Sequence, residues 1–210
     1  VRGGEFDEWF GFFYRRLVRP PSAPAVPPDH VLSESAALAG LSEAGGDSVM
    51  WLGHASFLIR LHGRTILTDP FLSQRASPFR RLGPMRYAGP ALPPERLPPI
   101  DLLLLSHNHY DHLDLPTLTR LEGRSRTTVV LPLRVSRYLH DQDFAAKLEV
   151  DWLQRVEVGG LTITAVPAIH FSKRGLFDRN ASLWCGFHIE APGRSLLFAG
   201  DTAYGPVFRE

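Results

Sequence analysis

The sequence predicts an α/β domain in which strands outnumber helices. Apolar residues alternate with polar ones, or follow one another directly, in many short stretches from position 49 onward, a pattern typical of strands. The pairs Gly159-Gly160 and Pro192-Gly193 lie between such stretches and indicate hairpin turns. The predicted strands cover residues 49–52, 55–61, 65–68, 100–105, 127–131, 148–153, 161–166, 183–190 and 195–199.

The strand predicted at 100–105 ends in four consecutive leucines, which favours a strand buried on both faces. Beyond it, Asp114 as an N-cap and Pro116 in the first turn predict a short helix that ends near Gly123. Residues 71–99 are rich in proline and show no periodicity. Loops of this length inside a domain are usually functional or disordered.

Two segments of different composition precede the domain that we predict over residues 48–210. Residues 1–20 predict an amphipathic helix, because aromatic side chains recur in it at helical spacing. Arginines flank this stripe, so residues 5–19 are a candidate for peripheral contact with a membrane; an arm packed on its own domain is the more frequent arrangement. Residues 21–47, rich in proline and alanine, predict an extended linker.

Composition disfavours several classes of protein. The 210 residues include 23 Lys and Arg against 22 Asp and Glu, so charge does not favour binding to nucleic acid. The leucine run at 102–105 is far shorter than the roughly 20 apolar residues of a membrane-spanning helix, and no secretory signal is visible. The single cysteine, Cys185, lies in an apolar alternating stretch that predicts a buried, unreactive thiol. These features fit a cytoplasmic protein, with the N-terminal helix as its contact with a membrane.

Side chains that bind metals are concentrated directly after the strand at 100–105. Three imidazoles and a carboxylate occur within six residues, at His107, His109, Asp111 and His112. In an extended loop His107 and His109 point the same way and can bind one cation, and the other two can face a second cation. A solvated histidine-rich loop, or core histidines satisfied by hydrogen bonds, is the alternative, which the clustering disfavours.

Two further candidates follow predicted strands. His170 comes after the strand at 161–166, and Asp201 comes after the strand at 195–199. Alone, each is more typical of a surface histidine or a turn aspartate. Together with His107 and His109, however, His170 completes a ligand set for the first cation, and Asp201 bridges to the second. Water held between two such cations is nucleophilic at neutral pH.

Several motifs resemble one branch of the metallo-β-lactamase superfamily. The H-x-H-x-D-H element at 107–112 is similar to the signature of that superfamily. Over residues 49–208, and more loosely in the N-terminal arm, the chain resembles the branch of N-acyl-phosphatidylethanolamine-hydrolysing phospholipase D (NAPE-PLD) and its bacterial relatives. The motifs that carry this resemblance are Trp51-Leu52-Gly53-His54-Ala55, Leu67-Thr68-Asp69-Pro70, Arg75-Ala76-Ser77-Pro78, Leu97-Pro98-Pro99-Ile100-Asp101, residues 106–114, and Phe198-Ala199-Gly200-Asp201-Thr202.

The resemblance implies an αβ/βα four-layer sandwich with two zinc ions at the edge between its sheets. It implies His107, His109 and His170 as ligands of the first zinc ion, Asp111 and His112 as ligands of the second, and Asp201 as the bridge. The family pattern adds a histidine from a later strand, but the histidines that remain all precede Asp201: His30, His54, His62, His140 and His188. For these 210 residues we therefore expect a sandwich truncated in its second half, one complete zinc site, a weakened second site and exposed apolar surface.

Four further residues are candidates for supporting roles. Asp69 follows the strand at 65–68 and either accepts a hydrogen bond from a ligating imidazole or caps the turn before Pro70. His54 lines the cleft or is a structural histidine, and the second reading is favoured. Arg75 and Lys173 are candidates for contact with a lipid phosphate, although solvated basic loops are more frequent. The same candidate role extends to Arg80, Arg81, Arg86 and Arg174.

Taken together, these residues predict a metal-dependent hydrolase. We expect Asp111, His112 and Asp201 to take part in catalysis and Asp111 to orient the attacking water. The family resemblance favours a phosphodiester of the N-acyl-phosphatidylethanolamine type as substrate. The alternatives are a lactone or another small ester as substrate on the same metals, and a non-catalytic fragment that binds only metal or membrane. Serine chemistry is disfavoured because no G-x-S-x-G element occurs.

Overall fold

The computed structural model describes residues 25–208 except residue 80. The chain divides into a short N-terminal unit, Val1–His30, and a second unit, Val31–Glu210, which contains every described strand. The amphipathic helix predicted for residues 1–20, with its membrane contact, lies outside the described residues and stays a prediction. Among the described helices, none has the length and hydropathy that crossing a membrane requires.

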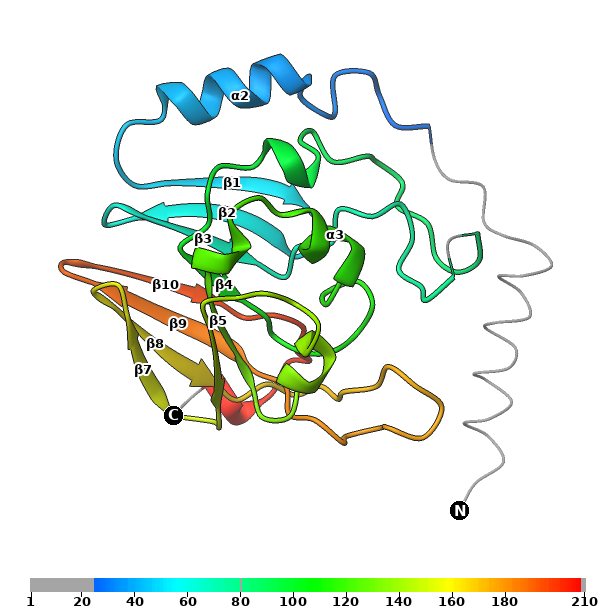
Figure 1. Cartoon of the computed structure of the whole chain (residues 1–210), viewed down its shortest axis with the longest axis vertical. Helices are drawn as coiled ribbons and strands as arrows, with labels where there is room; N and C mark the ends of the chain where they lie inside the picture. Colours follow the sequence, from blue (N-terminus) through cyan, green and yellow to red (C-terminus); the bar gives the residue numbers. More distant parts are fainter. Residues whose placement is uncertain (1–24, 80, 209–210) are drawn as a thin grey trace. The chain divides into compact units, whose positions relative to one another are not determined.

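The first six strands form one mixed sheet. Their bounds are β1 Ser48–Gly53, β2 Ser56–Leu61, β3 Arg64–Thr68, β4 Leu102–Leu104, β5 Thr128–Pro132 and β6 Ala146–Val150. They lie side by side in chain order (Figure 1). β1, β2 and β3 form an antiparallel meander, whereas β3, β4, β5 and β6 are parallel neighbours. The carboxyl ends of β3 and β4 therefore lie next to each other, and the segments that follow these strands start from the same edge.

The last four strands form a separate antiparallel sheet. Their bounds are β7 Arg155–Val158, β8 Leu161–Val166, β9 Gly186–Ala191 and β10 Arg194–Phe198. They are ordered β10-β9-β8-β7 and are joined pairwise in antiparallel register. The two predicted hairpin turns are present, because Gly159-Gly160 links β7 to β8 and Pro192-Gly193 links β9 to β10.

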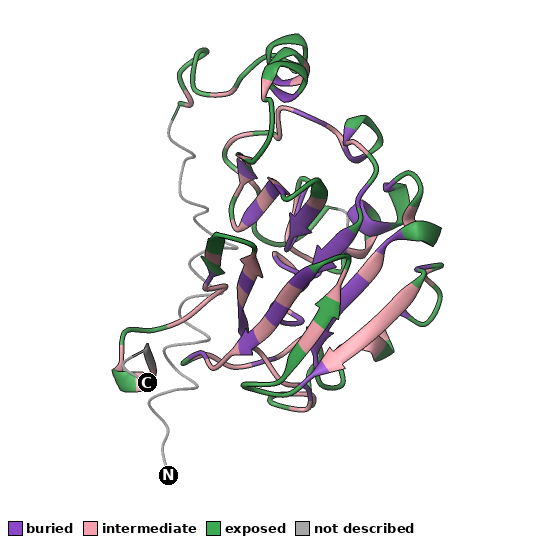
Figure 2. Ribbon diagram, turned by 90° about the vertical axis from the view of Figure 1, so that its left-hand side faces the viewer, coloured by how far each residue is buried: buried purple, intermediate pink, exposed green. Residues whose placement is uncertain are grey.

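An apolar core lies between the two sheets. The six-stranded sheet contributes one face of β2 to β6, and the four-stranded sheet contributes the inward residues of β8, β9 and β10. β8 shows this most clearly, because buried Leu161, Ile163 and Ala165 alternate with less buried residues. Figure 2 shows the buried residues concentrated in the strands. Burying these faces removes apolar surface from water, which is the main stabilisation of such a sandwich.

The opposite face of the six-stranded sheet carries the helices. A second core joins this face to α2, Glu34–Glu43, and α3, Leu115–Arg120. β4 contributes to both cores, since Leu103 faces the helices while Leu102 and Leu104 face the other sheet, and all three are at most 1% exposed. The prediction of a strand buried on both faces is confirmed.

The described part of the chain has three layers, a helix layer and two sheets. Both described α-helices pack on the six-stranded sheet. The outer face of β8, including Thr162 and Thr164, is partly exposed, and so is His188 on β9. The α/β class and the sandwich architecture are therefore as the sequence predicts, with the fourth layer not represented among residues 25–208.

One part of the predicted linker is folded. The prediction of an extended segment over residues 21–47 was wrong for Glu34–Glu43, which forms α2. The Ser33 side chain accepts a hydrogen bond from the backbone of Ala36 and caps the helix. Ala37 and Leu41 then bury against the core. A short alanine-rich stretch is helical here because its apolar side docks, and composition alone did not reveal that contact.

Three other elements differ from the sequence prediction. The strand predicted at 148–153 ends at Val150, and β7 was not predicted as a separate strand. Its Arg-Val-Glu-Val pattern alternates between exposed and partly buried residues, which was the available signal. In α3, the side chain of Asp114 makes no capping hydrogen bond to the helix backbone. It instead accepts from the Thr117 hydroxyl and from the backbone and hydroxyl of Ser73, so it ties the loop after β3 to the start of α3.

The buried thiol yields a direct prediction. Cys185 is 2% exposed, and desolvation by burial raises the pKa of its thiol well above the usual range. Thiol reagents attack the thiolate. We expect no labelling by a thiol reagent in the native state and one equivalent of label in denaturant, measured by absorbance or mass. Rapid native labelling would contradict this burial.

Candidate metal centre

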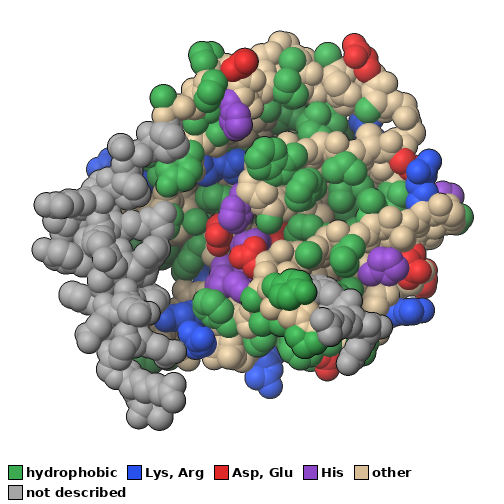
Figure 3. All heavy atoms as spheres, turned by 180° about the vertical axis from the view of Figure 1, so that it is seen from behind, with side chains coloured by type: hydrophobic (Ala, Val, Ile, Leu, Met, Phe, Trp, Pro, Cys, Tyr) green, Lys and Arg blue, Asp and Glu red, His purple; other side chains and the backbone are tan. Residues whose placement is uncertain are grey.

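The candidate ligands come from three separated segments that each follow a strand. Residues 106–112 follow β4, His170 follows β8, and Asp201 follows β10. The first segment belongs to the six-stranded sheet and the other two to the four-stranded sheet, so the packing of the two sheets brings them together. Histidine and acidic side chains gather near the centre of one face of the molecule (Figure 3).

Three imidazoles meet at one point. Nε2 of His107 lies 2.8 Å from Nδ1 of His109, and Nε2 of His170 lies 3.2 Å and 3.3 Å from these two atoms. Ligand atoms bound to one tetrahedral zinc ion at 2.0–2.1 Å lie about 3.3 Å apart. The triangle of nitrogens thus has the size of a face of a metal coordination shell.

A second group lies beside the first. Nε2 of His112 is 3.3 Å from Oδ2 of Asp201, and the same carboxylate oxygen is 3.8 Å from Nε2 of His170. Asp201 therefore stands between the two groups, where a bridging ligand is expected. His54 adds an imidazole whose Nε2 is 3.2 Å from Oδ2 of Asp111. Ligand atoms of His54, Asp111 and His112 all lie within 4.8 Å of one another.

The imidazoles of the first group are uncharged. Burial, followed by the neighbouring imidazoles, strongly lowers the pKa of His107. Burial and His170 lower the pKa of His109 to about 4, and burial lowers the pKa of His170. Neutral imidazole is the form that binds metals. Near pH 7 the three rings are therefore in the form that can bind a cation, and the nitrogens that approach one another point to a common position.

In the second group, ionised carboxylates surround the imidazole of His112. Burial opposes ionisation of Asp111, but His54 and His112 lower the pKa of this carboxyl to about 2. The contact with His112 lowers the pKa of Asp201. Burial acts to lower the pKa of His112, yet Asp201 and Asp69 outweigh it and raise that pKa to about 10. Without a metal, a proton on His112 partly balances the negative charge of the neighbouring carboxylates. The same negative charge would stabilise a bound cation.

The Nε2 atom of His112 is a further indication that these residues suit a metal ion. Nε2 of His112 is buried and makes no hydrogen bond to any described residue, although Asp201 lies close to it. The contact with Asp201 is a 3.3 Å ion pair rather than a well-aligned hydrogen bond, so this buried nitrogen is still open to a cation. Imidazole nitrogens and carboxylate oxygens are ligands that zinc and iron both accept. The residues present therefore suit a divalent transition metal, and their role as ligands is a proposal.

Asp69 takes the supporting position that the sequence allowed. It is 0% exposed and has a φ of +32°. Its Oδ1 accepts from the backbone N–H of Ser106 at 2.7 Å, and its Oδ2 accepts from the Ser106 hydroxyl at 2.5 Å and from Nδ1 of His112 at 2.7 Å. It does more than cap the turn before Pro70. Sequence reasoning missed Ser106, and the only signal was a hydroxyl directly before the first histidine.

His54 is held in a strained turn after β1. Gly53 and His54 have φ values of +100° and +52°, and the indole of Trp51 donates to the His54 carbonyl at 2.8 Å. The His54 ring packs edge-on against Phe71 and His112. A non-glycine residue with positive φ is uncommon and worth a functional explanation. The structure thus places His54 beside Asp111 and His112, and its role in the site stays a prediction.

The basic side chains play structural parts. The guanidinium of Arg75 donates to the Gly83 carbonyl at 2.7 Å within its own loop. Arg86 donates to the carbonyls of Leu52, Phe71 and Ala88. Arg174 donates to the carbonyls of Asn108 and Leu113 and lies 4.0 Å above the Tyr110 ring. The backbone N–H of Lys173 donates to Asn108. The phosphate contacts expected from Arg75 and Lys173 stay predictions.

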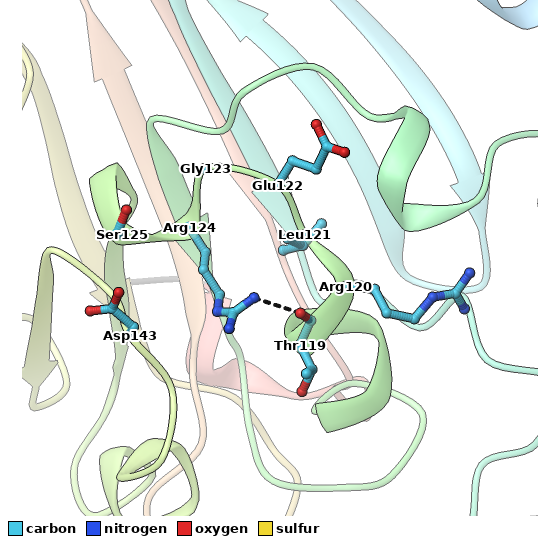
Figure 4. A pocket seen from close by; sticks show the side chains of 8 residues that line it. All are labelled: Thr119, Arg120, Leu121, Glu122, Gly123, Arg124, Ser125 and Asp143. Carbon is cyan, nitrogen blue, oxygen red and sulfur yellow. Dashed lines mark hydrogen bonds between the residues drawn. The ribbon is translucent and has the colours of Figure 1, made fainter.

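An open hollow lies elsewhere, at the C-terminal end of α3 (Figure 4). It is lined by Thr119, Arg120, Leu121, Glu122, Gly123, Arg124, Ser125 and Asp143. The guanidinium of Arg124 donates to the Thr119 carbonyl across it. None of the candidate ligands lines this hollow, and its mixed charges do not resemble the metal centre.

Comparison with known proteins identifies the class. A profile described as "Beta-lactamase superfamily domain" matches residues 64–210. The chain belongs to this superfamily, and its two-sheet α/β architecture is the metallo-β-lactamase fold. The predicted family is confirmed.

Two relatives are similar to this protein over about three quarters of its chain. The protein is 38% identical over 165 residues to Rv0906 of Mycobacterium tuberculosis, which covers 78% of this chain and 44% of the relative. It is 36% identical over 167 residues to "N-acyl-phosphatidylethanolamine-hydrolyzing phospholipase D 1" of Caenorhabditis elegans, covering 75% of this chain and 47% of that protein. The chain thus spans less than half the length of either relative.

A solved structure is similar to this protein over most of the chain. The crystal structure of CmlA, a diiron β-hydroxylase from Streptomyces venezuelae, matches with a TM-score of 0.54 and 26% identity. The match covers 96% of this chain and 36% of CmlA.

The loop after His170 yields a prediction about pH. Asp178 accepts from the backbone of Arg174 and Gly175 and from the Tyr138 hydroxyl. Burial opposes ionisation, but these hydrogen bonds lower the pKa of Asp178. A lowered folded-state pKa stabilises the fold above the unfolded value of about 3.9, and this contribution disappears as pH falls through the folded pKa.

We expect Asp178→Asn to lower the free energy of unfolding by about 1–2 kcal/mol at pH 7. The difference from the wild type should shrink between pH 5 and pH 3, in urea titrations followed by circular dichroism. Asp141→Asn is the control, because the Asp141 side chain is 81% exposed and pairs only with His140 among the described residues. A difference that does not change with pH would contradict this role of Asp178.

Proposed function

We propose that the protein is a metal-dependent hydrolase with two adjacent cation positions, acting on a phosphodiester of phospholipase D type. The observation that carries the proposal is the convergence of His107, His109 and His170 within 3.3 Å of one another, beside Asp201 and His112. Bound divalent cations in such a site supply Lewis acidity and acidify a water molecule.

The protein's own residues would have distinct roles. His107, His109 and His170, uncharged near neutral pH, would hold the first cation. His112 would contribute Nε2 to the second position, since its Nδ1 is engaged by Asp69. Asp201, 3.3 Å from His112 and 3.8 Å from His170, would contribute to both. Asp111, ionised and at the open side of the centre, would ligate the second cation and accept a hydrogen bond from the attacking water.

His54 would hold Asp111 in place. Its Nε2 lies 3.2 Å from Oδ2 of Asp111, and one carboxylate oxygen engaged by His54 leaves the other for a cation. The strained turn and the Trp51 indole fix the His54 backbone, so the direction of its imidazole is set before substrate arrives. Groups of this kind orient ligands and raise activity.

A lipid substrate is supported by two observations. One is the relative from Caenorhabditis elegans whose printed name specifies N-acyl-phosphatidylethanolamine. The other is a set of exposed apolar side chains that lie near the candidate ligands His170 and Asp201 in the chain. Ile169 precedes His170, Tyr204 follows Asp201, and Leu176 and Phe177 lie in the loop after His170, with exposures of 42%, 97%, 83% and 99%. Apolar surface beside a polar centre suits an acyl chain or a lipid surface.

A chelator experiment tests this function. The purified chain is incubated with N-acyl-phosphatidylethanolamine in mixed micelles, with and without EDTA, and the released phosphatidic acid is measured. We expect EDTA to abolish turnover and added Zn²⁺ or Fe²⁺ to restore it, because the metals supply the reactivity. Metal content is measured on the same sample by mass spectrometry. His107→Ala should lower turnover by at least about 100-fold, more than loss of an outer-shell partner.

His140→Ala is the matched control, since the His140 side chain is 73% exposed and pairs with Asp141. Turnover that is insensitive to EDTA would reject the mechanism. Hydrolysis of a soluble lactone or carboxylic ester, without hydrolysis of the phospholipid, would reject the proposed substrate class but would still support metal-dependent hydrolysis. Bound metal with no hydrolysis of either would favour the non-catalytic alternative.

The role proposed for His54 makes its own prediction. We expect His54→Ala to lower kcat by about 10-fold, a value at the lower end for residues that orient ligands, while the first metal equivalent stays bound. His54→Gln, whose amide can still donate to Asp111, should recover part of the loss. Steady-state kinetics and metal analysis of both variants check this. Equal losses of kcat for Ala and Gln, or loss of all metal, would contradict a positioning role.

A further inference from the structure

The hydroxyl of Ser106 lies between a carboxylate and an imidazole in the most buried part of the metal centre. Its Oγ is 2.5 Å from Oδ2 of Asp69 and 2.8 Å from Nδ1 of His107. All three residues are at most 1% exposed. Since bulk water does not reach these atoms, their hydrogen bonds must be satisfied within the protein.

The directions of these hydrogen bonds follow from the chemistry of the groups. An ionised carboxylate only accepts, and a serine hydroxyl has one proton to donate. Ser106 therefore donates to Asp69, and its oxygen accepts from Nδ1–H of His107. With the proton on Nδ1, the lone pair of His107 is on Nε2. That is the atom that lies 2.8 Å from His109 and 3.2 Å from His170.

The same carboxylate also directs the second group. Oδ2 of Asp69, which accepts from Ser106, accepts from Nδ1 of His112 at 2.7 Å as well. The Nε2 atom of His112 is left to face Asp201. One buried carboxylate thus sets the orientation of an imidazole in each of the two groups, directly for His112 and through a hydroxyl for His107.

Ser106 is also held from the opposite side. Its carbonyl accepts from the backbone of Cys185 at 3.0 Å. A Cβ added at Gly200, whose φ is +62°, would come 2.9 Å from Cβ and 3.2 Å from Oγ of Ser106. The turn that carries Asp201 therefore lies directly against Ser106. The position of the hydroxyl is set by the residue after β3, by the residue before β9 and by the segment after β10.

We propose that Ser106 is a positioning residue for the first cation position, through which the buried Asp69 orients His107 as well as His112. The two cation positions are then coupled by a single carboxylate, and Ser106 connects that carboxylate to one of them. This inference rests on the proposed metal binding, but the proton position on His107 is a property of the protein without metal.

The first measurement is the tautomer of His107 in the metal-free protein. Long-range ¹⁵N–¹H spectra of histidine-labelled protein distinguish Nδ1–H from Nε2–H, and His107→Gln assigns the resonance. We expect Nδ1–H in the wild type and in Ser106→Thr, which keeps the hydroxyl. In Ser106→Ala the preference should be lost, with a substantial fraction of Nε2–H. A wild-type His107 protonated on Nε2 would overturn the proposal, whether or not the variants fold.

The second measurement is the affinity for Zn²⁺, by competition with a chelating dye. Ser106→Ala should weaken the first equivalent by about 10- to 100-fold, the range for partners of metal ligands, and leave the second unchanged. Asp69→Asn should weaken both equivalents. Ser182→Ala is the matched control, because this serine is buried and its hydroxyl has no hydrogen-bond partner among the described residues.

The outcomes separate the two proposals. Unchanged affinity and tautomer in Ser106→Ala would overturn the role of Ser106 and leave the metal-dependent function standing. Equal weakening of both equivalents in Ser106→Ala would overturn its selective connection to the first position. A wild-type protein that binds no metal would reject the proposed function, while the tautomer of His107 would still decide the role of Ser106.

Discussion

A carboxylate buried at the end of β3 is the constraint on which the candidate metal centre depends. An unpaired charge at a fully buried position costs several kcal/mol, so Asp69 requires hydrogen-bond donors around it. Ser106 and His112 supply them, and both follow β4 in the chain. Because β3 and β4 are parallel neighbours, the carboxylate and its donors start from the same edge of the sheet. The hydrogen bonds to Asp69 therefore fix the path of residues 106–112, which include most of the candidate ligands.

The packing of the two sheets sets the remaining distances. His170 and Asp201 follow β8 and β10 of the four-stranded sheet, whereas residues 107–112 follow the six-stranded sheet. Apolar side chains between the sheets hold these groups at a separation at which nitrogens and oxygens approach within 4 Å. Interiors are close-packed and yield little, so a centre built across them keeps its geometry. The function proposed here thus depends on a hydrophobic interface that contains no catalytic side chain.

Charge is distributed unevenly over the centre. The three imidazoles of the first group are neutral because burial lowers their pKa values, and neighbouring imidazoles of the group lower those of His107 and His109 further. On the other side Asp69, Asp111 and Asp201 surround His112. The metal-free protein accommodates this negative charge with a proton on that imidazole. The same electrostatic field that retains the proton also favours a divalent cation at this place.

The sequence by itself determined the class of fold, the strand buried on both faces, and the identity of the candidate ligands. Short-range patterns carry these features: four consecutive leucines for β4, and imidazoles spaced two residues apart for the metal centre. Sequence reasoning did not find α2, β7 or Ser106. α2 depends on the docking of Ala37 and Leu41, and the alternation in β7 becomes informative only beside β8.

Only the tertiary structure decided which reading holds for residues whose neighbours are distant in the chain. Asp69 was equally consistent with a turn cap, yet it contacts Ser106 and His112, 37 and 43 residues away. His54 was more typical of a structural histidine, yet it faces Asp111. The basic residues Arg86 and Arg174 bind backbone carbonyls. A local pattern specifies which group a residue offers, but the partner of that group is fixed by how sheets and loops pack.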